Sequence, residues 1–109
     1  MIIDFDKMEF EKKTEFLGGN KNFYVRSVKD SLNNIMCDKL EAGASIGYHK
    51  HEKNSEIIYI IKGSGKVLYD NVEERVTEGQ CHYCPKGHYH SLINNTSSEL
   101  LFFAVVCEQ

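Results

Sequence analysis

Three histidines and one glutamate have the types and spacing of a metal site. His49 and His51 are two residues apart, so on a β-strand both imidazoles point to the same face. Glu56 follows after a short polar connection, where an antiparallel neighbour can bring its carboxylate to the same side. His90 comes directly after a tight turn at residues 85–87. Such a mixed nitrogen and oxygen set suits iron, manganese, nickel, copper or zinc better than calcium or magnesium.

The other two histidines are less informative. His88 lies in the turn before His90, and we expect it at the surface. His82 alternates with Cys81 and Tyr83, so it faces either the interior or the outside. We expect a structural role for both. No residue of the sequence stands out as a catalytic base, so the catalytic residues are unknown at this stage.

The segments that position these side chains have the pattern of strands. From Phe23 onward, short apolar runs are broken by turn residues, which is typical of an all-β sandwich or barrel. Residues 9–16 are interpreted either as a short helix that ends at Gly18 and Gly19 or as an extended arm. The expected strands are residues 23–28, 35–41, 45–51, 56–62, 66–70, 72–77, 80–84, 90–94 and 99–107.

Two of the expected strands are apolar on both faces. In residues 56–61, Ile58 and Ile60 share one face, while Ile57, Tyr59 and Ile61 share the other; residues 100–107 show the same pattern. A sheet that faces water on one side should be polar there. We therefore expect the outer face to be covered by the N-terminal arm, a second sheet or another subunit, and we predict a homodimer.

The four cysteines are expected to be free thiols. Cys81 and Cys84 are three residues apart in an expected strand, so their side chains point to opposite faces. They can therefore share neither a disulfide nor a metal ion. Cys37 and Cys107 complete the set, and in a reducing compartment buried thiols are the expectation for all four.

The full spacing of ten residues is far more specific than a His-x-His pair. The chain reads Gly43-x5-His49-x-His51-x4-Glu56-x6-Gly63, then Gly79-x5-Pro85-x-Gly87-x2-His90-x3-Asn94. This pattern resembles the two signature motifs of the cupin superfamily at all ten specified positions. The one departure is Gln80, where many relatives carry an acidic residue, and it affects no ligand.

The resemblance implies a single cupin jelly-roll barrel, a double-stranded β-helix. Residues 23–109 would form the barrel, and residues 1–22 an arm or short helix that packs on the barrel or on a partner subunit. One divalent transition metal ion per chain (zinc, iron, manganese or nickel) would be held by His49, His51, Glu56 and His90, with no other cofactor. Gly63, Gly79 and Gly87 would then occupy turns that need positive φ or a close backbone approach.

The resemblance leaves the reaction open, because cupins include enzymes and non-catalytic binders. The leading hypothesis is a metal-dependent isomerase or lyase that acts on a small oxygen-rich metabolite such as a sugar or uronate derivative. The metal would act as a Lewis acid. The alternatives are a non-catalytic binding or sensing module and an iron-dependent dioxygenase.

Composition excludes several other classes of function. The 109 residues allow one domain, and 41% hydrophobic residues suffice for a core. The net charge is −3, with Lys and Arg scattered, so we expect no nucleic-acid partner. The charged start does not resemble a signal peptide, and no run approaches a membrane span, so we expect no membrane partner and a cytoplasmic location.

Overall fold

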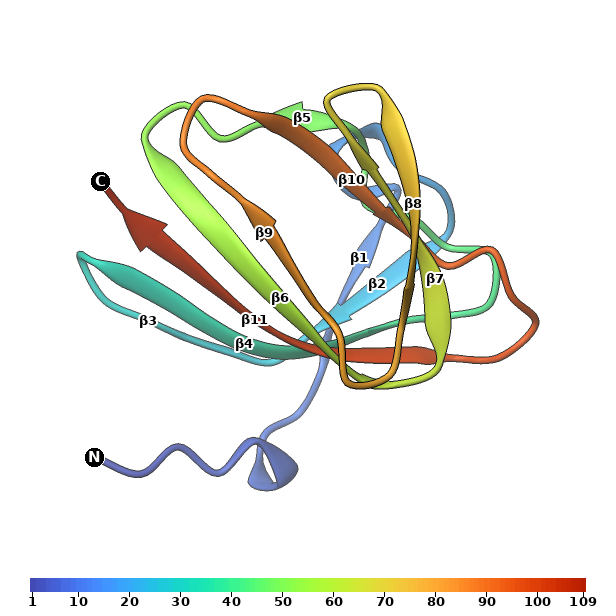
Figure 1. Cartoon of the computed structure of the whole chain (residues 1–109). Coiled ribbons are helices and arrows are strands. Elements are labelled where there is room, and N and C mark those ends of the chain that lie inside the picture. Colours follow the sequence, from blue (N-terminus) through green and yellow to red (C-terminus); the bar gives the residue numbers. More distant parts are fainter.

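Two antiparallel sheets make up the fold of the computed structural model, which describes residues 1–109 (Figure 1). In order across the larger sheet lie β1 (Glu11–Thr14), β2 (Asn22–Val25), β4 (Asn33–Leu40), β11 (Leu100–Glu108), β6 (Asn54–Lys62) and β9 (Cys81–Cys84), and β3 (Ser27–Lys29) also pairs with β4. The smaller sheet runs β5 (His49–Lys50), β10 (Tyr89–Ile93), β7 (Ser64–Tyr69) and β8 (Val72–Thr77). Two short 3-10 segments, η1 (Phe5–Lys7) and η2 (Phe16–Gly18), complete the chain. The all-β prediction is confirmed, and neither helical segment is long and apolar enough to span a membrane.

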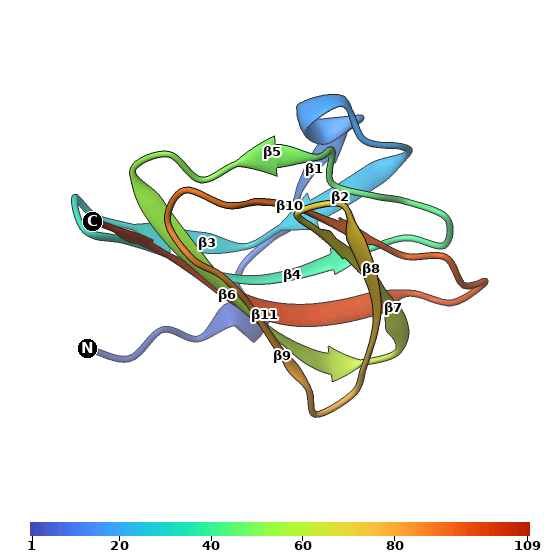
Figure 2. The ribbon, with the colours of Figure 1, turned by 45° about the horizontal axis from the view of Figure 1, so that its top comes forward.

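The core lies between the two sheets (Figures 1 and 2). Period-two alternation in β6 and β11 buries Ile58, Ile60, Phe102 and Ala104 almost completely. Phe23 of β2 stacks on Phe102, with ring centroids 6.0 Å apart. This apolar packing stabilises the strands that carry the predicted donors.

The expected strand at residues 45–51 is wrong over most of its length. Only β5 is a strand there, with an isolated bridge between Ser45 and Ile93. The backbone before His49 instead bonds to the N-terminal segment, because the Gly47 N–H donates to the Phe16 carbonyl oxygen at 3.0 Å. A Cβ at Gly47 would lie 1.8 Å from the Leu17 carbonyl oxygen, so only glycine permits this approach.

The N-terminal residues join the larger sheet. Residues 9–16 do not form the helix that was one of two interpretations, because β1 pairs with β2 in the register Glu11 to Val25. Residues 15–21, which we call the strap, then cross to the segment before His49. Glu15, Leu17 and Lys21 have φ values of +50°, +53° and +55°, so a regular helix cannot continue through the strap.

The single strand expected at residues 23–28 is divided at Arg26. Its backbone N–H donates to Asp38 Oδ1 at 3.1 Å, which separates β2 from β3. A side chain of β4 therefore takes the place of a backbone partner at this position.

Part of the larger sheet's outer surface stays uncovered. We call Ile57, Tyr59, Ile61 and Tyr83 the outer apolar face; they are 40%, 46%, 40% and 53% exposed. Phe5 of η1 packs edge-on against the neighbouring Phe103, with ring centroids 6.4 Å apart. The N-terminal segment thus covers part of this surface, and no second sheet of the same chain covers the rest.

The cysteines lie as alternation predicts. Cys81 is exposed and Cys84 is buried, on opposite faces of β9, and all four cysteines are free thiols in the structure.

Candidate metal centre

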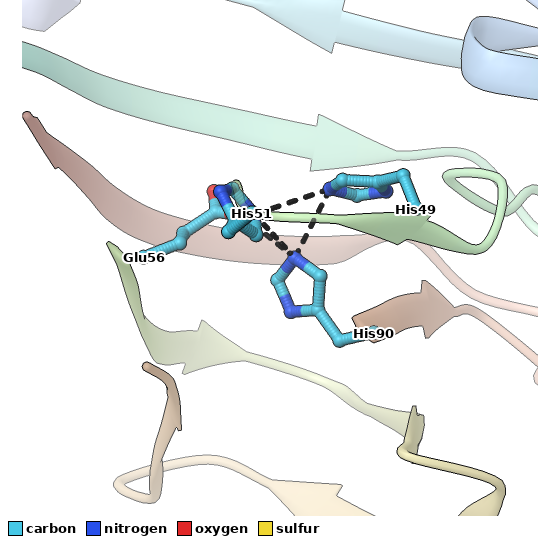
Figure 3. Close-up of side chains that lie close together, drawn as sticks. All are labelled: His49, His51, Glu56 and His90. Atoms are coloured by element: carbon cyan, nitrogen blue, oxygen red, sulfur yellow. Dashed lines mark hydrogen bonds and ion pairs between the residues drawn. The ribbon is translucent and has the colours of Figure 1, made fainter. Parts of the chain in front are cut away.

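The register of the smaller sheet sets two predicted donors against each other. His49 on β5 lies opposite His90 on β10. Their rings turn toward a common point that His51 and Glu56 also approach (Figure 3). The structure therefore brings all four predicted side chains together, although they come from three strands and one loop.

Backbone hydrogen bonds between the two sequence motifs fix His51. Its N–H donates to the His88 carbonyl oxygen at 3.0 Å, and its own carbonyl oxygen accepts from the Gly87 N–H at 2.7 Å. Gly87 has φ of +92°, which side chains other than glycine rarely adopt. The turn at residues 85–87 thus holds His51 beside His90.

Glu56 reaches the cluster from the larger sheet. It lies on the inward face of β6, opposite Val106 of β11. Its Oε1 is 3.2 Å from His51 Nε2 and 3.0 Å from His90 Nε2. The two sheets thus meet at this carboxylate.

The separations of the four candidate donor atoms would suit a metal ion with six coordination positions. The three imidazole Nε2 atoms are 2.9–3.2 Å apart, as are both contacts of Glu56 with His51 and His90. Glu56 and His49 are the one pair of the four whose donor atoms lie more than 4.0 Å apart. All four donor atoms lie within 4.8 Å of one another. With metal–ligand distances of about 2.1 Å, adjacent octahedral positions are about 3.0 Å apart, opposite ones about 4.2 Å and tetrahedral ones about 3.4 Å. Four octahedral positions with one opposite pair would match these separations, and two adjacent positions would then remain free for a ligand.

The outer nitrogen of each imidazole has its own partner. His49 Nδ1 donates to the Gly47 carbonyl oxygen at 2.6 Å, and His51 Nδ1 donates to Asn54 Oδ1. His90 Nδ1 lies 3.0 Å from His82 Nε2. Hydrogen bonds of this kind fix the tautomer and the ring orientation of metal-binding histidines. They leave the Nε2 lone pairs of His49 and His51 free to face the common point.

Burial and the neighbouring donors shift the pKa values of the cluster. Burial lowers the pKa of His49 and so favours the neutral, metal-binding form of its ring. Burial also acts to lower the pKa of His51, but hydrogen bonds to Glu56 and Asn54 outweigh it, and the net pKa is raised. For Glu56 burial acts to raise the pKa, yet hydrogen bonds from His51 and His90 hold it below its usual range. The carboxylate is therefore ionised throughout the neutral range.

His82, for which a structural role is expected from sequence, contacts the donor cluster. Its ring contacts His90 from β9, and His82 also lines a second hollow of about 450 Å³ together with Tyr69 and Tyr83. Burial, followed by the neighbouring His90, lowers the pKa of His82 to about 4. A neutral His82 can accept the Nδ1 proton of His90. His88, by contrast, contacts Asp70 and Tyr69 near the surface.

A cavity of about 730 Å³ opens beside the donors. His49, His51 and Glu56 line it and His90 does not, so it approaches the cluster from the side away from His90. Apolar side chains line much of the cavity. Five further charged side chains, Glu11, Lys13, Lys50, Glu52 and Lys53, and the uncharged polar Ser27, Asn34 and Asn54 also line it.

Two buried polar atoms nearby have no hydrogen-bond partner. They are Asp38 Oδ2 and Asn34 Oδ1, on the same face of β4. Burial is the main cause that raises the pKa of Asp38 to about 8, and the charge of Glu56 adds to it. The alternation of Met36, Asp38 and Leu40 along β4 is the sequence signal that places Asp38 inside.

Comparison with known proteins identifies the family of this chain. Residues 38–106 match the family model described as Cupin domain. An oxalate-binding protein of Thermotoga maritima is 39% identical over 69 residues, which cover 62% of this chain and 56% of that protein, little more than half its length.

Solved structures share the fold. The crystal structure of a predicted oxalate decarboxylase from Thermotoga maritima superposes with a TM-score of 0.94 at 24% identity and covers 100% of both chains. A sugar phosphate isomerase of the cupin superfamily from Silicibacter pomeroyi superposes with a TM-score of 0.72 at 21% identity, over 80% of this chain and 60% of the other. At these identities the similarity shows the fold alone.

Proposed function

Because the chain belongs to the cupin family, we propose that His49, His51, Glu56 and His90 hold one divalent transition metal ion, at which the protein binds a small oxygen-rich metabolite. The observation that carries this proposal is the arrangement of the four donor atoms. Five of their six separations suit adjacent octahedral positions, and the sixth suits an opposite pair.

Two adjacent open positions favour ligands with two neighbouring oxygens. Dicarboxylates, α-keto acids and α-hydroxy acids all present such a pair. The 39% identity to an oxalate-binding protein supports oxalate as the first ligand to test. When bound, the metal would supply Lewis-acid character toward such an anion.

The chain's own residues hold and orient the donors. Gly47, Asn54 and His82 keep the outer nitrogens occupied, so the rings do not need to reorient when an ion binds. Asn54 is fixed in turn, because its Nδ2 donates to Glu108 Oε1 at 3.3 Å. This preorganisation supports a resident metal ion.

Cobalt(II) substitution tests both the site and its open positions. We expect one ion per chain and a weak visible spectrum, typical of five or six ligands, that shifts when oxalate is added. His49→Ala and Glu56→Ala should lose most of the bound cobalt, whereas His88→Ala, which removes no donor, should retain it. An intense four-coordinate spectrum that is indifferent to oxalate would contradict the proposal.

Turnover is a second candidate, favoured by the charged side chains on the cavity wall. Glu11, Lys13, Lys50, Glu52 and Lys53 line the same cavity as the donors and can move a proton. An isomerase or lyase acting on a sugar or uronate derivative would use such a group next to a substrate carbonyl. Nuclear magnetic resonance in heavy water, with metal-loaded protein and a panel of uronates and sugar phosphates, would detect deuterium uptake. Absence of uptake across the panel would favour binding without turnover.

A further inference from the structure

We propose that the ligand is a chelating acid with an apolar tail, in which two head-group oxygens face the donor cluster and the tail lies against the apolar cavity wall. This inference rests on the proposed metal site and goes beyond it by assigning the rest of the ligand. It follows from the size of the cavity, its lining and its position beside the donors.

The cavity is larger than a small dicarboxylate requires. Its volume of about 730 Å³ falls in the range of roughly 300–1,000 Å³ that is typical of sites for larger small molecules. A ligand that filled only the two open coordination positions would leave most of this space to water. The cavity therefore indicates a ligand with a substituent beyond its chelating head.

The wall that such a substituent would meet is apolar. Phe23 and Val25 of β2, Met36 of β4 and Val106 of β11 line the cavity from the larger sheet. Val106 lies directly opposite the donor Glu56, so this wall begins at the cluster itself. Burial of apolar surface against it favours an aliphatic or aromatic tail.

The strap contributes a second apolar side. Phe16 and Leu17 line the same cavity, and Phe16 packs against Phe23 with ring centroids 5.5 Å apart. The uncharged polar lining residues are few: Ser27, Asn34 and Asn54. The five charged lining residues can bond to hydroxyl groups, but four of them (Glu11, Lys50, Glu52 and Lys53) are exposed to solvent. A polyhydroxylated sugar would therefore leave the hydroxyl groups along the apolar walls without partners, which is unfavourable. The lining thus favours an apolar tail over a sugar.

A series of acids with one head and growing tails tests the inference. Calorimetric titration of the metal-loaded protein would compare oxalate, pyruvate, α-ketobutyrate, α-ketohexanoate and phenylpyruvate, with galacturonate as the polar probe. We expect the dissociation constant to fall by up to about fourfold for each added methylene. Phenylpyruvate and α-ketohexanoate should bind more tightly than pyruvate and galacturonate.

Two polar substitutions of similar shape locate the tail. Val25→Thr and Val106→Thr should each lower the affinity for α-ketohexanoate relative to oxalate by at least threefold. The matched control Val72→Thr lies on β8, 59% exposed and outside the cavity, and should not change this ratio. Circular dichroism and metal content would verify that each variant is folded and loaded.

The outcomes separate this inference from the proposed function. If oxalate binds the metal-loaded protein but affinity does not rise with tail length, or galacturonate binds most tightly, the tail assignment is overturned and the metal site stands. If no acid of the series binds to the metal-loaded protein, the proposed function is contradicted and the tail assignment with it.

Discussion

At the scale of single residues, the three donor imidazoles differ in what holds their outer nitrogen. His49 and His51 donate to oxygen atoms, of Gly47 and Asn54, that can only accept. His90 is paired with another histidine, His82, which contributes no atom to the donor cluster. Among residues outside the donor set, His82 is therefore the one whose replacement should alter metal binding most directly.

Replacing His82 should weaken metal binding without removing a donor. We expect His82→Leu to lower the affinity for zinc or cobalt by about 10–100-fold, because His90 Nδ1 loses its acceptor. His82→Gln should retain more of the affinity, since its amide oxygen can accept the same proton. Competition with a chromophoric chelator would measure both variants. Equal affinities for His82→Leu and wild type would show that the His82–His90 contact does not support the metal.

His88→Gln is the matched control for this pair of variants. His88 is close to His90 in the chain, but its side chain contacts Asp70 and Tyr69 rather than the donors. Its replacement should leave the metal affinity close to the wild-type value.

Asp38 should make stability fall as pH rises. It is 1% exposed, and burial raises its pKa to about 8, so the folded protein holds a proton that the unfolded chain releases near its ordinary pKa of 3.8. Between about pH 4 and pH 8 the folded state binds more protons at this group, and its contribution to stability decreases with pH.

The variant Asp38→Asn removes this titration. Its free energy of unfolding relative to wild type should increase by on the order of 1 kcal/mol per pH unit from about pH 4 to pH 8. Urea denaturation in the presence of a chelator would measure it. Asp30→Asn is the control, because backbone hydrogen bonds lower the pKa of Asp30 and no such rise is expected above pH 4. A difference between Asp38→Asn and wild type that does not change with pH would contradict the assignment.

The donors could be predicted from sequence, but their supporting residues could not. The spacing of His49, His51, Glu56 and His90 is a property of the chain itself, so the cluster that the structure brings together was already predictable. His82 and Asp38 depend on which strands are neighbours, because their partners lie on β10 and beside β2. Cross-strand contacts of this kind have no local signal in one sequence.

At the scale of elements, the strap and the segment before His49 form one unit. Phe16 accepts a hydrogen bond from the Gly47 N–H, and Asn20 accepts one from the Ser45 N–H at 2.9 Å. The Gly47 carbonyl oxygen in turn holds the His49 ring. Gly47 thus links the strap directly to His49, a proposed metal donor.

A side chain at Gly47 should separate these two segments. In Gly47→Ala the new Cβ would meet the backbone of Leu17 at 1.8 Å, and backbone cannot move as a flexible side chain does. We expect a loss of about 2–4 kcal/mol in the free energy of unfolding, together with weaker metal binding. Urea denaturation and metal titration would measure the two effects.

Gly79→Ala is the control for this variant. Gly79 has φ of +85°, but a Cβ there would meet nothing within 4 Å. This substitution should destabilise through backbone strain by about 1 kcal/mol and leave metal affinity unchanged. If both variants behave alike, the close approach at Gly47 is not what orients His49.

The same contacts explain where strand prediction failed. Residues 45–48 have strand-like composition, but the Ser45 and Gly47 N–H groups donate to the strap, and only the Ile46 N–H donates to β10, so no long ladder forms. The left-handed residues of the strap are Glu15, Leu17 and Lys21 as well as Gly18, and of these only Gly18 gives a sequence signal for a turn. By contrast, strands β6 and β11 follow period-two alternation and were predicted nearly to their ends.

At the scale of the whole molecule, the outer apolar face supports a homodimer. Ile57, Tyr59, Ile61 and Tyr83 are contiguous across β6 and β9, because Ile57 lies opposite Tyr83 in the register. Exposed apolar patches of this kind are unusual on monomers. We expect sedimentation to report a dimer at micromolar concentrations.

Charged substitutions on that face should yield monomers. Ile57→Glu combined with Ile61→Glu should shift the sedimentation coefficient to that of a single chain, because a dimer would bury the new carboxylates. Val72→Glu, at a more exposed apolar site on β8, should leave the dimer intact. A wild-type monomer at all concentrations would contradict the homodimer.

The position of β11 in the larger sheet has a consequence for biosynthesis. This strand begins at Leu100, yet it lies between β4 and β6 and pairs with both along nearly its whole length. On the ribosome, β4 and β6 are translated well before the strand that joins them. The nascent chain therefore carries the unpaired β11-facing edge and the apolar side chains of β6 until β11 has left the exit tunnel. We expect folding to be late, slow and dependent on protection by chaperones, and truncations within β11 to be insoluble rather than merely less stable.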